Sequence, residues 1–416
     1  MMFSPTSLDH PVPHSKDRPA NRGQDQARPD AQALILDELP TPSLLLDYER
    51  LERNLRTMAE RCARRGVALR PHLKTVKCAE AAKLARRLGA RGFTVSTLQE
   101  AEFFFTHGFD DLIYPATPVG LKLDRAAALV RAGCTLRVTV EQVDGAELLM
   151  AAGRRLGVAF ETLIEIDSGD HRAGIAPDSA ALLTIAAALR GFEKEKAGAR
   201  LAGVLTHGGH SYRGRTAGEM RAYAEQEREA VVGGAERLRC AGHACEIVSG
   251  GSTPTAVHGV EHAGLTELRP GVYMLGDVFQ VTAGSHTLDD IAANVLTAVI
   301  GHQRANGTLL IDAGSMALTK DCSAGPLSDP SDTGYGLIAD ASGRVLSNLR
   351  VIGLYQEHGV VGSRDPRIPI DLAAFPLGTK LRVLPHHACL TAAQFDLYHV
   401  HQAGRVVGQW TRVRGW

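Results

Sequence analysis

The sequence has no excess of charge of either sign. Lys and Arg together number 46, and Asp and Glu together also number 46, so the formal net charge is zero. Chains that bind nucleic acid or an anionic membrane surface usually carry a basic excess. We therefore expect neither partner. A run of about 18 apolar residues is also missing, so the sequence predicts no membrane-spanning helix.

Cysteine is scarce and has no pattern of close spacing. An odd number of scattered cysteines does not fit a disulfide framework and indicates a reducing compartment. The first 32 residues are rich in Pro, Asp, Arg and Gln and lack the apolar segment of a secretory signal. We predict a cytoplasmic protein with a disordered tail over residues 1–32. The seven cysteines are Cys62, Cys78, Cys134, Cys240, Cys245, Cys322 and Cys389.

The remaining chain is long enough for two domains. Between residues 33 and 280, β-prone runs alternate with helical stretches, which predicts parallel strand pairing. Eight such units favour a (β/α)₈ TIM-type barrel over the alternative, a doubly wound open sheet. The predicted strands are Val67–His72, Gly92–Val95, Asp111–Pro115, Leu136–Val140, Thr162–Asp167, Leu201–His207, Glu246–Ser249 and Glu267–Arg269.

After residue 280 the helical periodicity weakens, and short β-prone runs are separated by Gly, Pro, Ser and Asp. We predict a second, mostly β domain over residues 281–416. The early run Ser43–Leu46 is compatible with pairing in either domain. The predicted strands of the second domain include Val295–Ile300, Gly307–Ile311, Val345–Leu349, Lys380–Val383 and Arg405–Trp410.

A lysine follows the first predicted barrel strand, in the segment Arg70-Pro71-His72-Leu73-Lys74. The carboxyl ends of barrel strands carry the active sites of such enzymes, so Lys74 is placed to act as a nucleophile that forms a Schiff base. The alternative is a solvated loop lysine without a role.

Paired glycines follow the seventh predicted strand, in the segment Val248–Thr255. Glycine lets backbone N–H groups approach an anion closely, and the Ser and Thr hydroxyls add donors. Barrels often bind phosphate in the loops after strands seven and eight. The segment therefore predicts either a phosphate loop or a plain Gly/Ser turn.

Polar residues also gather at the ends of the fifth and sixth predicted strands. Glu165–Gly174 concentrates charge, and Thr206–Tyr212 holds two histidines and a tyrosine. A single histidine is usually structural, but this group at a barrel mouth favours contact with a ligand.

Near the C-terminus, His387 and Cys389 stand two positions apart. If the segment is extended, their side chains point the same way, and an imidazole with a thiolate suits Zn²⁺. Two protein ligands would leave positions open for water and substrate. The alternative is a pair of packed side chains without a metal.

Taken together and in this order, these segments resemble the fold-type III pyridoxal-phosphate enzymes, which have an alanine-racemase-like barrel. More narrowly, they are similar to the metal-activated branch that contains eukaryotic-type D-serine dehydratase and D-threonine aldolase. The resemblance begins near Pro42 and runs to the C-terminus. It rests on Thr41–Asp47, Arg70–Cys78, Ile166–Gly174, Ser249–Thr255, Glu267–Tyr273 and Gln356–Gly359.

The resemblance implies roles for individual residues. Lys74, and not Lys77, matches the cofactor lysine, which also serves as the catalytic base. The metal pair His387 and Cys389 matches the H-x-C pattern of the dehydratases and not the H-x-D of the aldolases. The implied residues that bind pyridoxal 5'-phosphate are Lys74, Arg172, His207, Tyr212, Gly250, Gly251, Ser252 and Thr253.

The resemblance implies a homodimeric lyase that depends on pyridoxal phosphate and a divalent metal and acts on D-β-hydroxy amino acids. The thiolate favours Zn²⁺ over Mn²⁺ or Mg²⁺. The first expectation is a D-serine dehydratase that forms pyruvate and ammonia. The alternatives are an aldolase of D-threonine or another D-3-hydroxy amino acid, a D-threo-3-hydroxyaspartate dehydratase, and a non-catalytic cofactor-binding protein. An extra cationic group in the pocket would favour the hydroxyaspartate enzyme.

Overall fold

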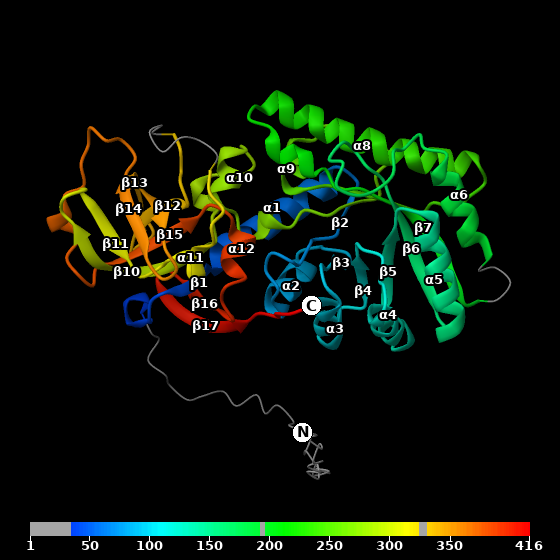
Figure 1. Cartoon of the computed structure of the whole chain (residues 1–416), viewed down its shortest axis with the longest axis horizontal. Coiled ribbons are helices and arrows are strands. Elements are labelled where there is room, and N and C mark those ends of the chain that lie inside the picture. The colour runs from blue at the N-terminus through cyan, green and yellow to red at the C-terminus, as the bar shows by residue number, and fades with distance from the viewer. Residues whose placement is uncertain (1–34, 192–195, 324–330) are drawn as a thin grey trace, which may run out of the picture. The chain divides into compact units, whose positions relative to one another are not determined.

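The computed structural model describes residues 35–191, 196–323 and 331–416. The predicted tail over residues 1–32 lies outside them. The described strands form two sheets, one of eight strands and one of nine (Figure 1). No helix among the described residues is both long and apolar enough to cross a membrane.

The eight-stranded sheet is a closed parallel barrel, as predicted. Its strand order is β2-β9-β8-β7-β6-β5-β4-β3. A parallel bridge between His72 and Thr94 joins the two ends of this order, and the N–H of Leu73 donates to the Thr94 carbonyl at 2.8 Å. This closure excludes the open doubly wound sheet. The strands are β2 (Ala68–Leu69), β3 (Phe93–Thr94), β4 (Asp111–Tyr114), β5 (Thr135–Val140), β6 (Ala159–Glu165), β7 (Gly198–Leu205), β8 (Ile247–Gly250) and β9 (Glu267–Leu268).

Most helices of this part cover the outside of the barrel with an apolar face. In α1 the buried side chains recur at helical spacing, at Leu51, Leu55, Met58 and Cys62. The Asp47 side chain begins this helix by accepting the N–H of Arg50 at 3.0 Å. The helices of this part are α1 (Tyr48–Arg64), α2 (Ala79–Arg87), α3 (Leu98–Thr106), α4 (Leu121–Arg131), α5 (Val143–Leu156), α6 (Ala181–Ala188), α8 (Ala217–Cys240), α9 (Thr253–His258) and α10 (Val278–Thr282).

The nine-stranded sheet has the order β11-β14-β13-β12-β15-β10-β1-β16-β17, and β10 also pairs with β11. The six strands from β11 to β10 therefore close on themselves, while β1, β16 and β17 extend the sheet. The mostly β character predicted for this part is confirmed. Its strands are β10 (Ala293–Gln303), β11 (Thr308–Ile311), β12 (Gly336–Asp340), β13 (Val345–Leu354), β14 (Gly359–Ser363), β15 (Lys380–Pro385), β16 (Leu397–Gln402) and β17 (Arg405–Thr411), with the short helices α11 (Ser315–Leu318) and α12 (Ala388–Ala392).

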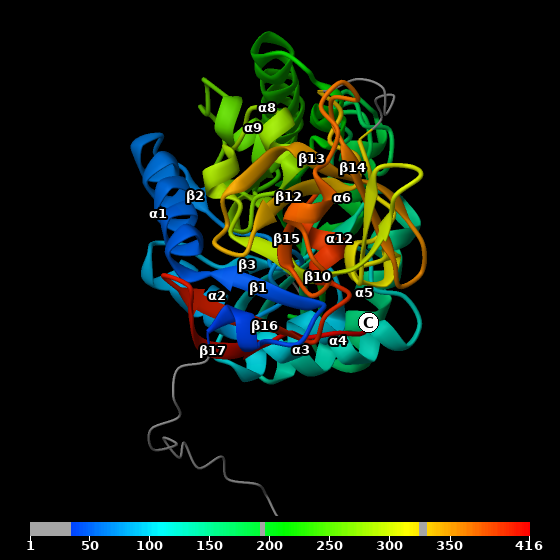
Figure 2. The same ribbon diagram turned by 90° about the vertical axis from the view of Figure 1, so that its left-hand side faces the viewer.

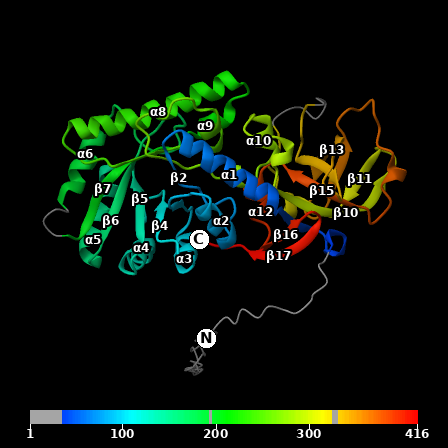
Figure 3. The same cartoon turned by 180° about the vertical axis from the view of Figure 1, so that it is seen from behind.

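The early run of apolar residues joins the second sheet. Strand β1 (Ser43–Asp47) pairs antiparallel with β10 and parallel with β16, and Figure 2 shows it beside β16. Because β1 is central, its side chains are buried on both faces, and Leu44, Leu45 and Leu46 are at most 1% exposed. Helix α1 then leads from this sheet to the barrel (Figure 3).

The second sheet also packs against the segment that follows Lys74. The hydroxyl of Tyr398 on β16 donates to the Val76 carbonyl at 3.0 Å. The N–H of Val413, just after β17, donates to the Lys77 carbonyl at 2.7 Å. The backbone that presents Lys74 is thus held in part by the C-terminal sheet.

A buried histidine of this sheet makes stability depend on pH. His401 is 3% exposed, and neither ring nitrogen has a partner among the described residues. Burial, with Arg382 nearby, lowers the pKa of His401 to about 4. Between this value and the unfolded pKa of about 6.5, only the unfolded chain binds the proton, so the free energy of unfolding falls as pH decreases through this range.

We therefore expect the wild-type protein to lose roughly 2 kcal/mol more stability than His401→Phe between about pH 7.5 and about pH 5. Urea unfolding at both pH values measures this difference. Equal losses in the two proteins would show that His401 does not titrate in this way.

Candidate active site

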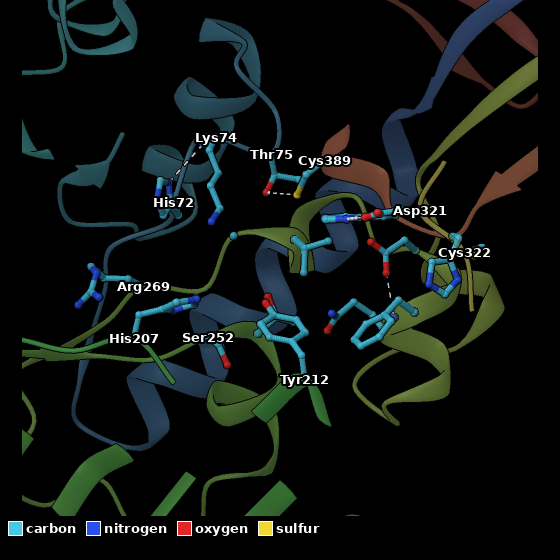
Figure 4. A pocket seen from close by; sticks show the side chains of 18 residues that line it. His72, Lys74, Thr75, His207, Tyr212, Ser252, Arg269, Asp321, Cys322 and Cys389 are labelled. Atoms are coloured by element: carbon cyan, nitrogen blue, oxygen red, sulfur yellow. Dashed lines mark hydrogen bonds and ion pairs between the residues drawn. The ribbon is translucent and has the colours of Figure 1, made fainter. Parts of the chain in front are cut away.

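A cavity of about 410 Å³ lies at the carboxyl ends of the barrel strands, and residues of α10 and α12, with Asp321 and Cys322, complete its lining (Figure 4). Its size lies within the range of small-molecule and cofactor sites. It is lined by His72, Lys74, Thr75, His207, Tyr212, Ser252, Thr253, Arg269, Gly271, Val272, Asp277, Phe279, Gln280, Asp321, Cys322, His386, His387 and Cys389.

Lys74 extends its side chain into this cavity (Figure 4). Leu73, which precedes it, is fully buried and fixes the turn after β2. Among the described residues, no hydrogen bond or ion pair engages the Lys74 amine. Lys77 differs, because its Nζ lies 3.0 Å from the buried carboxylate of Glu100. The structure therefore leaves Lys74 available for chemistry and gives Lys77 a structural ion pair.

The barrel side of the cavity carries positive charge. Arg269 is 6% exposed and donates to the Ser249 hydroxyl at 2.6 Å. Burial, with the charges of Lys74 and Arg269, holds the pKa values of His72 and His207 well below the usual range. Both imidazoles are therefore neutral beside two cations. This environment suits an anionic group such as a phosphate.

Ser252 and Thr253 of the predicted phosphate loop reach the cavity wall. The Ser252 hydroxyl also caps α9 by accepting the N–H of Thr255 at 3.3 Å. It lies 3.0 Å from the hydroxyl of Ser211, which links the loops after β7 and β8. Two of the four loop residues proposed for the phosphate are thus placed where a ligand can contact them.

The paired glycines lie behind the wall and are not among its lining residues. Gly251 has φ of +100°, and a Cβ there would lie 3.0 Å from the Leu268 side chain. Its N–H donates to Glu227 Oε1 at 3.1 Å. The Gly250 carbonyl accepts a hydrogen bond from the N–H of Arg269, the residue directly after β9. Their phosphate contacts stay a prediction, and their observed role is to shape the loop.

Arg172 is likewise outside the set of lining residues. Its side chain is 58% exposed and lies 3.9 Å from the Glu165 carboxylate. Its charge still contributes to the lowered pKa of His207. The structure does not bring its guanidinium to the cavity wall, and its contact with the cofactor stays a prediction.

Tyr212 lines the cavity from the short 3-10 helix Gly209–Arg213. Its ring centroid lies 5.6 Å from that of Phe279 on α10. Burial, with the nearby charges of Cys389 and Asp277, raises the pKa of the Tyr212 phenol. The phenol is therefore a neutral hydrogen-bonding group on the side of the cavity that holds the predicted metal pair.

His387 and Cys389 both line the cavity. The predicted extended segment is wrong for Cys389, because only His387 is extended, with φ −132° and ψ 106°, and α12 begins at Ala388. His387 Nδ1 lies 2.7 Å from Asp321 Oδ2. Cys389 Sγ lies 3.2 Å from the Thr75 hydroxyl.

The electrostatics of the pair fit a cation. Burial opposes charge on His387, but Cys389, Asp277 and Asp321 raise its pKa to about 10. Burial would likewise raise the pKa of the Cys389 thiol, but hydrogen bonds from His387 and Thr75 hold it below its usual value. The lowered pKa favours the thiolate form of Cys389, and imidazole with thiolate is a donor set for zinc. Over residues 35–191, 196–323 and 331–416, no group of three or more His, Cys, Asp or Glu side chains is arranged to hold an ion.

Several lining residues were not singled out from the sequence as site residues. Arg269 lies within Glu267–Tyr273, a segment of the family resemblance, so a signal for it existed. Asp277, which is 1% exposed and accepts the Ala388 N–H at 3.0 Å, had no comparable signal. Asp321 also had no signal, because its contact in the cavity is with His387, which lies 66 residues further along the chain.

Comparison with known families matches both parts of the chain. Residues 46–278 match the alanine racemase N-terminal domain, and residues 292–401 match a putative serine dehydratase domain. The D-threo-3-hydroxyaspartate dehydratase of Delftia sp. (strain HT23) is 43% identical over 380 residues, covering 91% of this chain and 98% of that protein. The D-serine dehydratase of Dictyostelium discoideum is 30% identical over 380 residues, covering 88% of this chain and 94% of that protein.

Solved structures agree with these matches. The Delftia D-threo-3-hydroxyaspartate dehydratase superposes with a TM-score of 0.87 at 42% identity, covering 92% of this chain and 100% of that chain. Structures of two variants of the same enzyme are also similar. In one a histidine is replaced by alanine, and in the other a cysteine two positions further along is replaced and the protein is in the metal-free form.

Proposed function

The chain belongs to the fold-type III pyridoxal-phosphate lyases that join an alanine-racemase-like barrel to a serine-dehydratase-type domain, and we propose that it is a metal-dependent dehydratase of D-3-hydroxy amino acids. The observation that carries the proposal is the shared cavity. It brings the Lys74 amine together with the imidazole of His387 and the thiolate of Cys389.

The residues present fit pyridoxal phosphate. Lys74 would hold the cofactor by its aldehyde, and Ser252 and Thr253 would hold its phosphate. When bound, the cofactor supplies an electron sink that makes the α-proton of an amino acid acidic. The Lys74 amine is placed to take that proton as a general base. Tyr212 lines the cavity beside Phe279 of α10 and offers a neutral phenol.

His387 and Cys389 fit a divalent metal, and the thiolate favours Zn²⁺. A metal held there supplies a Lewis acid at the β-oxygen of the substrate, where hydroxide is otherwise a poor leaving group. Because these two side chains supply only two ligands, coordination positions of the metal would remain open for a substrate oxygen and water, as in catalytic zinc sites. A histidine and a cysteine at the same spacing in the Delftia variants support elimination over aldol cleavage.

D-threo-3-hydroxyaspartate is the first substrate we propose, because the hydroxyaspartate dehydratase is 43% identical to this chain and the D-serine dehydratase is 30% identical. This reverses the order expected from the sequence. D-serine is the second candidate, for which the described lining gives a specific reason. Lys74 and Arg269 are the only lysine and arginine among those residues. Lys74 is assigned to the cofactor, and Arg269 donates to Ser249 and Thr206, so neither is left for a second carboxylate.

Product analysis tests the proposal. We expect D-threo-3-hydroxyaspartate and D-serine to yield a 2-oxo acid and ammonia, and a chelator to suppress both reactions. D-Threonine separates the alternatives, because an aldolase releases glycine and an aldehyde from it. Glycine as the main product would contradict a dehydratase, and no turnover of any D-amino acid despite bound cofactor would indicate a non-catalytic protein.

We also propose a homodimer, a cytoplasmic location and a domain boundary near residue 280. The free state of all seven cysteines supports a reducing compartment, and the gap between the two family matches supports the boundary. Sedimentation of the active enzyme tests the dimer, which a fully active monomer would contradict.

A further inference from the structure

Each member of the proposed metal pair is held by a side chain outside the pair. Asp321 Oδ2 lies 2.7 Å from His387 Nδ1, and the Thr75 hydroxyl lies 3.2 Å from Cys389 Sγ (Figure 4). The partners are 66 and 314 residues apart along the chain. The fold, and not the local sequence, therefore creates both contacts, and both lie in the wall of the same cavity.

The contact with Asp321 determines which nitrogen of His387 is free. A histidine that binds a metal must be neutral, so one ring nitrogen carries a proton and the other offers its lone pair. The Asp321 carboxylate accepts the proton on Nδ1, which leaves Nε2 as the ligand atom and fixes the plane of the ring. Without this acceptor, the imidazole can rotate or carry its proton on the wrong nitrogen.

The contact with Thr75 acts on the sulfur. A metal-bound thiolate has no proton, so the Thr75 hydroxyl must be the donor. Thr75 is fully buried, and its carbonyl accepts a hydrogen bond from the Arg412 guanidinium at 3.4 Å. The hydroxyl is therefore held in place next to Lys74, where it stabilises the thiolate and limits the rotation of the Cys389 side chain.

We propose that Asp321 and Thr75 are positioning residues of the metal site. Asp321 sets the orientation of His387 and Thr75 that of Cys389, so metal affinity depends on two side chains that do not bind the ion. This inference rests on the proposed role of His387 and Cys389 as the metal pair.

Titration of the cofactor-loaded protein with Zn²⁺ and Co²⁺ tests the role of Asp321. We expect Asp321→Ala to weaken metal binding by about 10- to 100-fold. Asp321→Asn should lose less, because its carbonyl oxygen can still accept the Nδ1 proton. Asp167→Ala is the matched control, since Asp167 makes the same 2.7 Å contact with Nδ1 of His171 outside the cavity lining.

The absorption spectrum of the Co²⁺ form tests the role of Thr75. Removing the donor in Thr75→Val should move the sulfur-to-cobalt charge-transfer band to lower energy and weaken affinity by about tenfold at most, the size of one hydrogen bond. Thr94→Val is the matched control, because Thr94 is fully buried and its hydroxyl has no partner among the described residues.

The outcomes separate the inference from the proposed function. In every variant, retained absorbance of the bound cofactor reports a folded barrel. If the wild-type protein binds Zn²⁺ and Asp321→Ala binds it equally tightly, Asp321 does not position His387. An unchanged cobalt spectrum in Thr75→Val would likewise overturn the role of Thr75. If the wild-type protein itself takes up no metal, the proposed metal pair is wrong and the inference is overturned with it.

Discussion

Replacing Lys74 by arginine is expected to abolish the visible absorbance of the bound cofactor and to lower turnover by about 10³-fold or more. Arginine keeps the positive charge and a similar length, but a guanidinium does not form a Schiff base with an aldehyde. It also stays protonated, so it has no lone pair with which to take a proton from the substrate. Absorbance spectra and steady-state rates with the preferred D-amino acid measure both effects.

The matched control is Lys77→Arg, three residues further along the same segment. Arginine at this position preserves the buried ion pair with Glu100, so the spectrum and the rate should stay close to those of the wild type. Borohydride reduction and peptide mapping then locate the cofactor on the chain. Loss of the absorbance in Lys77→Arg, with retention in Lys74→Arg, would reverse the assignment of the two lysines.

The fold was largely predictable because its elements obey simple periodicities. All eight barrel strands were identified from β-prone runs that alternate with helical segments, and six strands of the second sheet, including β1, were identified from short β-prone runs. Strands β12, β14 and β16 were not identified. Glycines open and interrupt β14, and β12 is buried along most of its length, so neither shows the alternation of a half-buried strand.

The site residues could be predicted only where they belong to a short sequence motif. The sequence pointed to Lys74, Tyr212 and His387, and the structure brings these residues to one cavity. Asp321 and Asp277 gave no signal, because their roles arise from contacts across 66 and 111 residues. No local pattern predicts such contacts, since they depend on how the second sheet docks onto the barrel.

Removing the metal is expected to stop the elimination while leaving the cofactor in place. In the proposed mechanism, the amine of Lys74 takes the α-proton, whereas the metal held by His387 and Cys389 acts at the β-oxygen. In Cys389→Ala, or in chelator-treated wild type, the visible absorbance of the cofactor should persist, and exchange of the α-proton with solvent should continue. Release of the 2-oxo acid should fall by about 10³-fold, since Lewis-acid help to a departing oxygen is worth about 4 kcal/mol.

Cys322→Ala is the control for this prediction, because Cys322 lines the same cavity but is not a member of the metal pair. It should retain both the metal and the activity.

After chelation, Zn²⁺ should restore the wild-type enzyme better than Mg²⁺. The Cys389→Asp variant should instead prefer Mn²⁺, because a carboxylate is a harder ligand than a thiolate. Elemental analysis of protein purified without added metal provides the decisive comparison. Full elimination activity in a preparation free of divalent ions would show that His387 and Cys389 are packed side chains, and that the hydroxyl leaves by a route that these two residues do not assist.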